Sequence, residues 1–379
     1  MSPIKLVATT AFGIESVAAQ EIKDLGFEGI VTENSRVIYE GDHLGIVLSN
    51  LWLRTPDRIY ILMGTFKALT FEELFQGVSR IEWEKFIDAK GRFPVEAKSV
   101  KSQLFSLSDI QAISKKAMVK RLGAHYKTEW FEESAGTYRV VVSILKDQVS
   151  VLLDTSGEAL HKRGYRSRGY QAPLKETLSA ALIKISRWRP GIQLVDPLCG
   201  TGTILIEAAM MGRNIAPGLN RKFASEKWPL FPGELYPRER KKAFEAIDHE
   251  AALHLEGYDQ DSRAIKIAME NALEAGVAED IHFQVRRLEA FSTKRAYGYI
   301  ITNPPYGERL GEKAQVEALY RQMGEVFNPL ATWSKYILTS METFEENFGH
   351  KATKNRKLYN GRIKAYFYQY YGEKPKRGV

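Results

Sequence analysis

Apolar and polar residues follow two different patterns along the chain, and the change comes near Ala172. The first part mixes short alternating segments, typical of half-buried strands, with amphipathic helical segments. Alternation predicts strands at Ile4–Thr9, Arg36–Tyr39, Arg58–Phe66, Phe93–Ala97, Tyr138–Leu145 and Val149–Asp154, and helical spacing predicts helices after Gly13, from Thr70 and over Ser108–Leu122. These segments predict small α+β modules, with the last two strands joined as a hairpin around Lys146–Gln148.

The second part alternates short apolar strands with longer helices. The strand patterns lie at Gln193–Asp196, in a segment that ends near Asp259, and at Ile281–Val285, Tyr297–Thr302 and Lys335–Thr339. Strands separated by helices predict a parallel, doubly wound sheet. The chain then predicts a hairpin, Arg356–Tyr359 and Ile363–Tyr370, which would add an antiparallel strand to that sheet.

Composition narrows the class of protein. At 379 residues the chain is long enough for two or three domains of roughly 100–200 residues each. A single cysteine, Cys199, excludes an internal disulfide framework, and with seven scattered histidines it forms no zinc pattern, so we expect no metal site. No apolar run reaches the roughly 18 residues of a membrane span, and no secretory signal is present. We therefore expect a cytoplasmic protein without a membrane partner.

Positive charge is concentrated in three places. Residues 351–379 hold nine basic residues and one acidic residue, so the first 350 residues carry 45 of each sign. The stretch Ala97–Lys127 carries seven cations and one acid, which fits either a solvated helix face or a phosphate-binding surface. The segment 162–170 adds four cations with glycines and tyrosines, which suits either a plain interdomain connection or a linker that contacts nucleic acid.

A glycine-rich loop, Asp196-Pro-Leu-Cys-Gly-Thr-Gly-Thr203, follows the first strand of the predicted parallel sheet. It lacks the third glycine of a dinucleotide-binding loop and the Gly-Lys-Ser/Thr of a phosphate loop. The loop therefore does not indicate a dinucleotide or ATP, and the ligand that fits it is a small adenosyl compound without phosphates. Asp259 ends the next strand, where a carboxylate accepts hydrogen bonds from ribose hydroxyls. The alternative for Asp259 is a cap of the following helix, a role that Asp261 or Ser262 could also fill. For Cys199 we expect packing as a small apolar side chain.

The motif Asn303-Pro304-Pro305-Tyr306 directly follows another predicted strand. Two prolines remove two amide donors, so carbonyl oxygens line this turn. The Asn303 side-chain oxygen and the Pro304 carbonyl could accept the two N–H bonds of an exocyclic base amine and stabilise the positive charge that develops on it during methyl transfer. Tyr306 could stack on the base. The alternative is a tight turn with a capping asparagine.

These motifs together resemble those of S-adenosylmethionine-dependent amino-methyltransferases with a THUMP domain. The similarity extends to His161–Tyr165, Ala172–Glu176, Arg213–Asn220 and Lys357–Gly361 and covers nearly the whole chain. It is closest to the stand-alone guanine-N2 methyltransferases of large-subunit ribosomal RNA, whose members are also labelled N6-adenine-specific DNA methylases. The resemblance implies a Rossmann-like methyltransferase domain at residues 161–379, with an insert near 211–250, preceded by a ferredoxin-like module at 1–67 and a THUMP domain at 68–160.

The resemblance also implies roles for individual residues. The base amine would be held by Asn303, Pro304, Pro305 and Tyr306. S-adenosyl-L-methionine would be bound by Ala172, Pro173, Leu174, Lys175, Glu176, Asp196, Pro197, Gly200, Thr201, Gly202, Thr203, Asp259 and Gln260, and its adenine either by Glu289 or by backbone groups alone. RNA would be contacted by Lys98, Lys101, Lys115, Lys116, Lys120, Arg121, Lys162, Arg163, Arg166 and Arg168.

The expected activity is therefore monomethylation of guanine N2 in 23S ribosomal RNA. N6-adenine methylation of DNA or RNA is the alternative with the same chemistry. A ribosome assembly factor that binds RNA without catalysis is the alternative from another class, and the intact Asn303–Tyr306 motif argues against it. The insert could be a lid, a part of the substrate surface or a structural helix.

Overall fold

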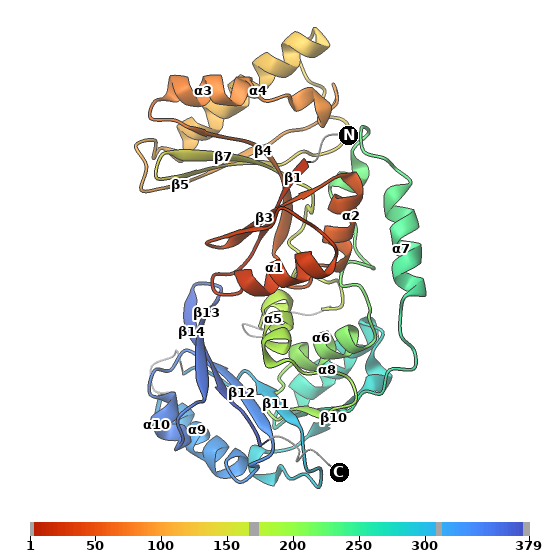
Figure 1. Ribbon diagram of the computed structural model, residues 1–379, viewed down its shortest axis with the longest axis vertical. Helices are drawn as coiled ribbons and strands as arrows, with labels where there is room; N and C mark the ends of the chain where they lie inside the picture. The colour runs from red at the N-terminus through yellow and green to blue at the C-terminus, as the bar shows by residue number, and fades with distance from the viewer. Residues whose placement is uncertain (1–3, 167–173, 308–312, 374–379) are drawn as a thin grey trace. The chain divides into compact units, whose positions relative to one another are not determined.

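A computed structural model describes residues 4–166, 174–307 and 313–373 and divides the chain into two compact units (Figure 1). The N-terminal unit contains the chain up to Thr10, then Ala18–Leu160 and Arg221–Lys242. The C-terminal unit contains Ala11–Val17, His161–Asn220 and the chain from Ala243 onwards. Each unit is built on a seven-stranded sheet.

The N-terminal sheet has the strand order β2-β3-β1-β4-β7-β6-β5 and is antiparallel except between β5 and β6. Its strands are β1 (Ile4–Thr9), β2 (Val31–Glu33), β3 (Arg36–Gly41), β4 (Arg58–Lys67), β5 (Val95–Val100), β6 (Val140–Leu145) and β7 (Gln148–Asp154). Its helices are α1 (Glu15–Asp24), α2 (His43–Trp52), α3 (Phe71–Ser79), α4 (Leu107–Tyr126) and α7 (Leu235–Glu245), with short turns of helix at Trp83–Lys85 and Ser225–Lys227.

Helices α3 and α4 lie together along one face of strands β5 to β7 (Figure 1). Helix α3 begins with a capping box, in which the Thr70 hydroxyl accepts from the Glu73 amide and the Glu73 carboxylate accepts from the Thr70 amide. Its buried residues Leu74 and Val78 join one core with the alternate strand residues Val140, Val142 and Ile144. On the other face of β6, Val141 is also buried and packs with Val7, Tyr60 and Leu152 in a small separate core.

The C-terminal sheet has the strand order β10-β9-β8-β11-β12-β14-β13. Its strands are β8 (Leu194–Asp196), β9 (Leu255–Asp259), β10 (Ile281–Val285), β11 (Tyr299–Thr302), β12 (Ser334–Thr339), β13 (Lys354–Asn360) and β14 (Ile363–Tyr370). Its helices are α5 (Glu176–Ser186), α6 (Thr203–Gly212), α8 (Ser262–Glu274), α9 (Lys313–Phe327) and α10 (Phe344–Phe348), with short turns of helix at Ala278–Asp280 and Leu288–Ala290. Strands β8 to β12 are parallel, and β14 pairs antiparallel with β12 and with β13.

Two apolar cores cover the two faces of this sheet. One core joins α5, α6 and α8 to inward residues such as Ile301 and Phe367, and the other joins α9 and α10 to Ile300 and Ile337. The strand order reverses on either side of β8, so the first crevice at the carboxyl ends of the strands opens between β8 and β11. The predicted doubly wound sheet and its antiparallel terminal hairpin are confirmed.

Some elements were not predicted. Helix α2 is apolar on nearly all sides, with Ile46, Val47 and Leu51 buried, so it shows no period that sequence reading could detect. Segment Arg221–Lys242, from the predicted insert, folds with the N-terminal unit. No helix among the described residues combines the length and the apolar character needed to cross a membrane.

Candidate cofactor and base-amine site

Three polar side chains meet at the carboxyl ends of adjacent strands in the C-terminal unit. Asp259 ends β9, Asp196 ends β8, and Asn303 follows β11 directly. The parallel register pairs Asp196 with Gly257 and Val195 with Ile300, so the three strand ends lie side by side. Each of them stands at or directly after the end of a parallel strand predicted from the sequence, and the carboxyl ends of parallel strands share one edge of a sheet.

The Asp259 carboxylate fixes the glycine-rich loop, which we call the cofactor loop (Asp196–Thr203). One oxygen accepts from the Gly200 amide at 3.0 Å and the other from the Asp261 amide at 2.9 Å. The loop is also tied to β9 by the Cys199 amide, which donates to the Tyr258 carbonyl at 2.8 Å. The cap of α8 is Asp261, whose side chain accepts from the Arg263 amide. The capping alternative for Asp259 is therefore filled by its neighbour, and the Asp259 carboxylate faces the loop.

Gly200 and Gly202 both adopt positive φ, at 52° and 79°. A Cβ at Gly202 would lie 2.8 Å from Phe283 Cζ and 3.1 Å from Ala268 Cβ, so this glycine allows close packing of the loop on the sheet. A Cβ at Gly200 would meet no described atom within 4 Å. The backbone of Gly200 therefore borders open space, as expected where a ligand approaches the main chain.

Asp196 is buried, with 2% of its surface exposed. Burial raises the pKa of its carboxyl group to about 7, against the opposing effects of the Thr302 hydroxyl and the Leu198 amide. The same surroundings raise the pKa of the Cys199 thiol well above its usual value, again mainly through burial. A neutral, buried thiol is a poor nucleophile, and Cys199 belongs to the apolar core as predicted.

A buried ionic network lies beside the start of α6. Arg166 Nη2 donates to the Thr203 hydroxyl at 2.9 Å and lies 3.4 Å from Glu176 Oε1. Glu176 is 3% exposed, and burial raises its pKa above the usual range. Its second oxygen, Oε2, has no hydrogen-bond partner among residues 4–166, 174–307 and 313–373. A buried carboxylate oxygen without a donor is costly, so the site suits a ligand that brings one.

The turn after β11 holds the Asn303–Tyr306 motif. The Tyr306 hydroxyl donates to Asn303 Oδ1 at 2.6 Å, and this bond orients the Asn303 amide. The Tyr320 hydroxyl, on α9, donates to the Pro305 carbonyl at 2.8 Å and contacts the Thr339 hydroxyl at 2.7 Å. Tyr320 thereby anchors the turn to β12, a role that the sequence analysis missed. The helical spacing of Val316, Tyr320, Met323 and Phe327 was the signal that could have revealed it.

These residues fit S-adenosyl-L-methionine, which carries an ammonium group, a ribose and a cationic sulfur. The carboxylates of Asp196 and Glu176 suit positive charge, Asp259 suits hydroxyl donors, and the Gly200 backbone leaves room beside them. Among the other predicted ligands, Leu174, Pro197, Thr201 and Thr203 are buried, Lys175 is half-buried and Gln260 is exposed. Ala172 and Pro173 lie outside the described residues. Glu289 is exposed, accepts from Gln322 Nε2 at 3.2 Å and lies 3.8 Å from Arg287, so its adenine contact stays a prediction.

The predicted RNA-binding cations are in different environments. Lys98, Lys101, Lys116, Lys120 and Lys162 are exposed. Lys115 pairs with Glu133 at 3.3 Å and lies 3.6 Å from the centre of the Phe93 ring, and Arg121 pairs with Glu84. Arg166 is held by the network described above, and Arg168 lies outside the described residues.

Arg163 is the clearest departure from expectation. It is 4% exposed and pairs with Glu207 at 3.4 Å, and Glu207 also accepts from the Tyr165 hydroxyl. The prediction that Arg163 contacts RNA is wrong for this conformation, because a buried guanidinium already paired with a carboxylate cannot reach a phosphate.

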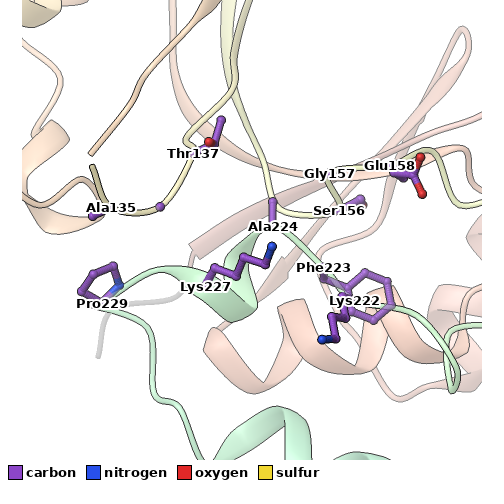
Figure 2. Close-up of a pocket in the computed structure, with 11 residues that line it drawn as sticks. Ala135, Thr137, Ser156, Gly157, Glu158, Lys222, Phe223, Ala224, Lys227 and Pro229 are labelled. Carbon is purple, nitrogen blue, oxygen red and sulfur yellow. The ribbon is translucent and has the colours of Figure 1, made fainter. Parts of the chain in front are cut away.

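A cavity of about 710 Å³ lies entirely within the N-terminal unit (Figure 2). It is bordered by the loop 135–137, the loop 156–158 and the insert residues Lys222, Lys227 and Pro229. None of the predicted site residues lines it. The insert therefore completes a surface of the N-terminal unit, and its two exposed lysines at this cavity had no counterpart in the sequence analysis.

Comparison with known proteins relates the geometry to a family. Residues 163–369 match the RMKL-like methyltransferase domain, residues 5–60 the RlmL ferredoxin-like domain, and residues 68–154 the THUMP domain. The chain is 49% identical, over 100% of its length and 98% of the relative's, to YpsC of Bacillus subtilis (strain 168), a protein assigned as an RNA methyltransferase. It is 32% identical to the ribosomal RNA large subunit methyltransferase K/L of Syntrophotalea carbinolica, over 96% of this chain but 53% of that protein.

A solved structure that resembles this chain is, like both relatives, a methyltransferase by its description. The crystal structure of SMU.472, assigned as a methyltransferase and complexed with SAH, superposes with a TM-score of 0.94 at 46% identity, covering 99% of this chain and 100% of that one. The chain belongs to the family of RMKL-like methyltransferases that carry a THUMP domain, and it is an S-adenosylmethionine-dependent RNA methyltransferase.

Proposed function

We propose that this RMKL-like methyltransferase methylates the exocyclic N2 amine of guanine in 23S ribosomal RNA, in the cytoplasm. The observation that carries the proposal is the position of the Asn303–Tyr306 motif, which directly follows β11 at the same strand ends where Asp196 ends β8 and Asp259 ends β9 and holds the cofactor loop. The 32% identity to a ribosomal RNA large subunit methyltransferase supports the choice of RNA.

The chain's own groups account for the chemistry at the amine. S-adenosyl-L-methionine supplies a methyl group on a positively charged sulfur. Asn303 Oδ1 and the Pro304 carbonyl accept the two N–H bonds of the base amine, which favours a tetrahedral nitrogen and stabilises its developing charge. The nitrogen forms its new bond to carbon as the methyl–sulfur bond breaks, and the proton leaves to water. No strong base is required, because the methylated amine is acidic until it loses that proton.

The hydroxyl of Tyr306 sharpens this assignment. Its 2.6 Å bond to Asn303 Oδ1 holds the amide in one orientation, and in this proposal the ring stacks on the base. Tyr306 thus has two separable contributions, one through its ring and one through its hydroxyl. Base presentation also requires an unpaired or flipped nucleotide, since a stacked guanine cannot bring N2 to the edge of a sheet.

Substitution of Asn303 tests the proposal. For Asn303→Ala we expect methyl transfer to fall by about 10²–10³-fold, because one stabilising acceptor is lost, while RNA and SAH affinities stay within about twofold of wild type. Tyr306→Phe is the matched control, which keeps the ring and removes only the hydroxyl, and it should give a smaller loss. Unchanged methylation by Asn303→Ala would exclude this mechanism. Absence of methylation by the wild type would instead favour the non-catalytic assembly role.

N6-adenine methylation is the second candidate. The two acceptors would bind the N6 amine of adenine as readily as N2 of guanine, because both amines are planar and each presents two N–H bonds. The identity of the methylated base decides between the two activities.

A further inference from the structure

One end of the N-terminal sheet exposes a group of apolar side chains. Val100 and Leu145 are register partners at the ends of β5 and β6 and are 54% and 53% exposed. Phe105, in the loop that leads to α4, is 81% exposed, and Leu107 at the start of α4 is 45% exposed. An apolar group exposed at one place on the surface marks a site of interaction more often than scattered apolar residues do.

The loop that carries Phe105 is fixed to the neighbouring β6–β7 turn. The Gln103 amide donates to Asp147 Oδ1 at 2.7 Å, and the Asp147 amide donates to the Ser102 hydroxyl at 3.1 Å. The Lys146 amide donates to the Val100 carbonyl at 3.1 Å. These bonds hold the loop and the turn together, so the exposed residues form a built surface.

The backbone at this end of the sheet is strained. Lys101, Lys146 and Asp147 have φ of 51°, 50° and 63°, in the left-handed region that favours glycine. Non-glycine residues persist in that region when the surroundings hold them there, and they are concentrated at functional sites. Two of these three residues, Lys101 and Lys146, are exposed lysines.

The charge around Phe105 is positive. Lys98 and Lys101 are exposed on and after β5, Lys146 is exposed in the turn, and Lys67 is exposed at the end of β4, opposite Gln148. Four described acids lie near these lysines, and three of them already have partners. Asp147 accepts from the Gln103 amide, Glu96 near Lys98 pairs with Arg139, and Glu73 near Lys67 accepts from the Thr70 amide. The fourth is Asp109 in the first turn of α4. An exposed aromatic ring among lysines is the combination that binds unpaired nucleic acid, by stacking a base and neutralising phosphates.

We propose that this loop-tip surface (Phe105, Val100 and Leu145 with Lys67, Lys98, Lys101 and Lys146) binds an unpaired segment of the RNA substrate. A base stacks on Phe105, and the adjoining phosphates lie near Lys98, Lys101 and Lys146. The inference rests on the proposed RNA substrate and adds where, and in which form, the N-terminal unit holds it.

Trp130 provides a matched comparison within the same unit. It is also 81% exposed, but its neighbours in sequence include the exposed acids Glu129, Glu132 and Glu133. Exposure is therefore the same at the two positions, but the charged residues beside them in sequence differ. Those beside Trp130 are acids, of which Glu132 pairs with Lys90 and Glu133 with Lys115, whereas the loop of Phe105 carries the exposed Lys101. If exposure alone attracted RNA, both rings would contribute; if the basic surroundings matter, only Phe105 will.

The test uses the full chain and a 12-nucleotide single-stranded RNA that contains one 2-aminopurine, with the same strand annealed into a duplex for comparison. Stacking on a ring quenches 2-aminopurine, so fluorescence reports stacking and anisotropy reports affinity. We expect Phe105→Ala to weaken single-strand binding roughly tenfold and to remove the quenching. Phe105→Tyr should keep both, Trp130→Ala should change neither, and SAH affinity should be the same in all variants as a check on folding.

Several outcomes would overturn the proposal. These are no measurable binding of the single strand by wild type, equal binding by Phe105→Ala, an equal loss in Trp130→Ala, or tighter binding of the duplex with no dependence on Phe105. Methylation of ribosomal RNA by wild type is measured in parallel. If methylation occurs and Phe105 has no effect on binding, the surface assignment fails while the proposed function stands; if no RNA is methylated, the proposed function itself fails.

Discussion

The two sheets differ in how they use charged side chains. At the carboxyl ends of β8 and β9 the acids are buried or bonded to backbone amides, and the cations near them are paired inside the unit, as Arg163 is with Glu207. At the tip of β5 and β6 the lysines are exposed and the backbone that carries them is strained. A buried charge needs a partner for the fold to be stable, whereas an exposed charge is solvated by water and can bind a ligand of opposite charge. Substitutions in the first region should therefore act on stability and cofactor affinity, and those in the second on RNA binding.

The largest effect is expected from Arg163→Ala, which leaves Glu207 buried without its partner. Breaking a buried ion pair in this way costs about 3–5 kcal/mol of unfolding free energy. Lys162→Ala, at the exposed neighbouring position, should stay within about 0.5 kcal/mol of wild type. Denaturant unfolding measures both variants. If Arg163→Ala were as stable as wild type yet bound RNA more weakly, the assignment of this arginine to the interior would be wrong.

The two glycines of the cofactor loop should separate stability from cofactor binding. Gly202→Ala combines a strained φ with a 2.8 Å approach to Phe283, so we expect roughly 3 kcal/mol lower stability. Gly200→Ala carries only the cost of its φ, about 1 kcal/mol, but its methyl group would enter the space assigned to the cofactor.

Calorimetric titration with SAH and thermal unfolding together test this pair. Gly200→Ala should bind SAH at least tenfold more weakly than wild type while remaining folded. SAH affinity equal to wild type in Gly200→Ala would show that the cofactor does not lie against this part of the loop.

A smaller effect is the pH dependence that arises from Asp196. Burial raises the pKa of this carboxyl to about 7, so without cofactor the protonated form is favoured below that pH, and the stability it contributes is lost as pH rises through 7. An ammonium group on the ligand favours the carboxylate instead. SAH affinity should therefore increase with pH between 6 and 8, by at most about tenfold per unit below the pKa.

Asp196→Asn is the control for this dependence. It should bind SAH more weakly and with a smaller slope against pH, the remainder arising from Glu176, whose pKa is also raised by burial. The same slope in the variant as in wild type would assign the titration to another group.

The sequence predicted that Asp196, Asp259 and Asn303 each stand at or directly after the carboxyl end of an apolar strand, and the parallel sheet aligns those ends. Helix α9 could also have been predicted from the sequence, since its buried residues recur at helical spacing. The environment of Arg163 could not be predicted, because its partner Glu207 is 44 residues away in the sequence and only packing brings the two together. The same holds for Arg221–Lys242, whose place in the N-terminal unit depends on long-range contacts. Asn50 Nδ2 donates to the Tyr236 hydroxyl, and the Ser225 hydroxyl donates to the Thr155 carbonyl.

Charge density along the chain was an incomplete guide for the same reason. The segments 97–127 and 162–166 are both rich in cations, yet the first keeps several on the surface and the second buries Arg163 and engages Arg166 with Glu176. Whether a cation is available to RNA depends on the acids that the fold brings to it, and those acids are distant in sequence.

The central claim is best tested by identifying the nucleoside that the protein methylates. The purified protein is incubated with labelled S-adenosylmethionine and unmodified large-subunit ribosomal RNA, and the digested nucleosides are resolved by mass spectrometry, with Asn303→Ala as the impaired control. We predict label in N2-methylguanosine from wild type and about 10²–10³-fold less from the variant. Label in N6-methyladenosine, or no labelled nucleoside from wild type, would contradict the proposed activity.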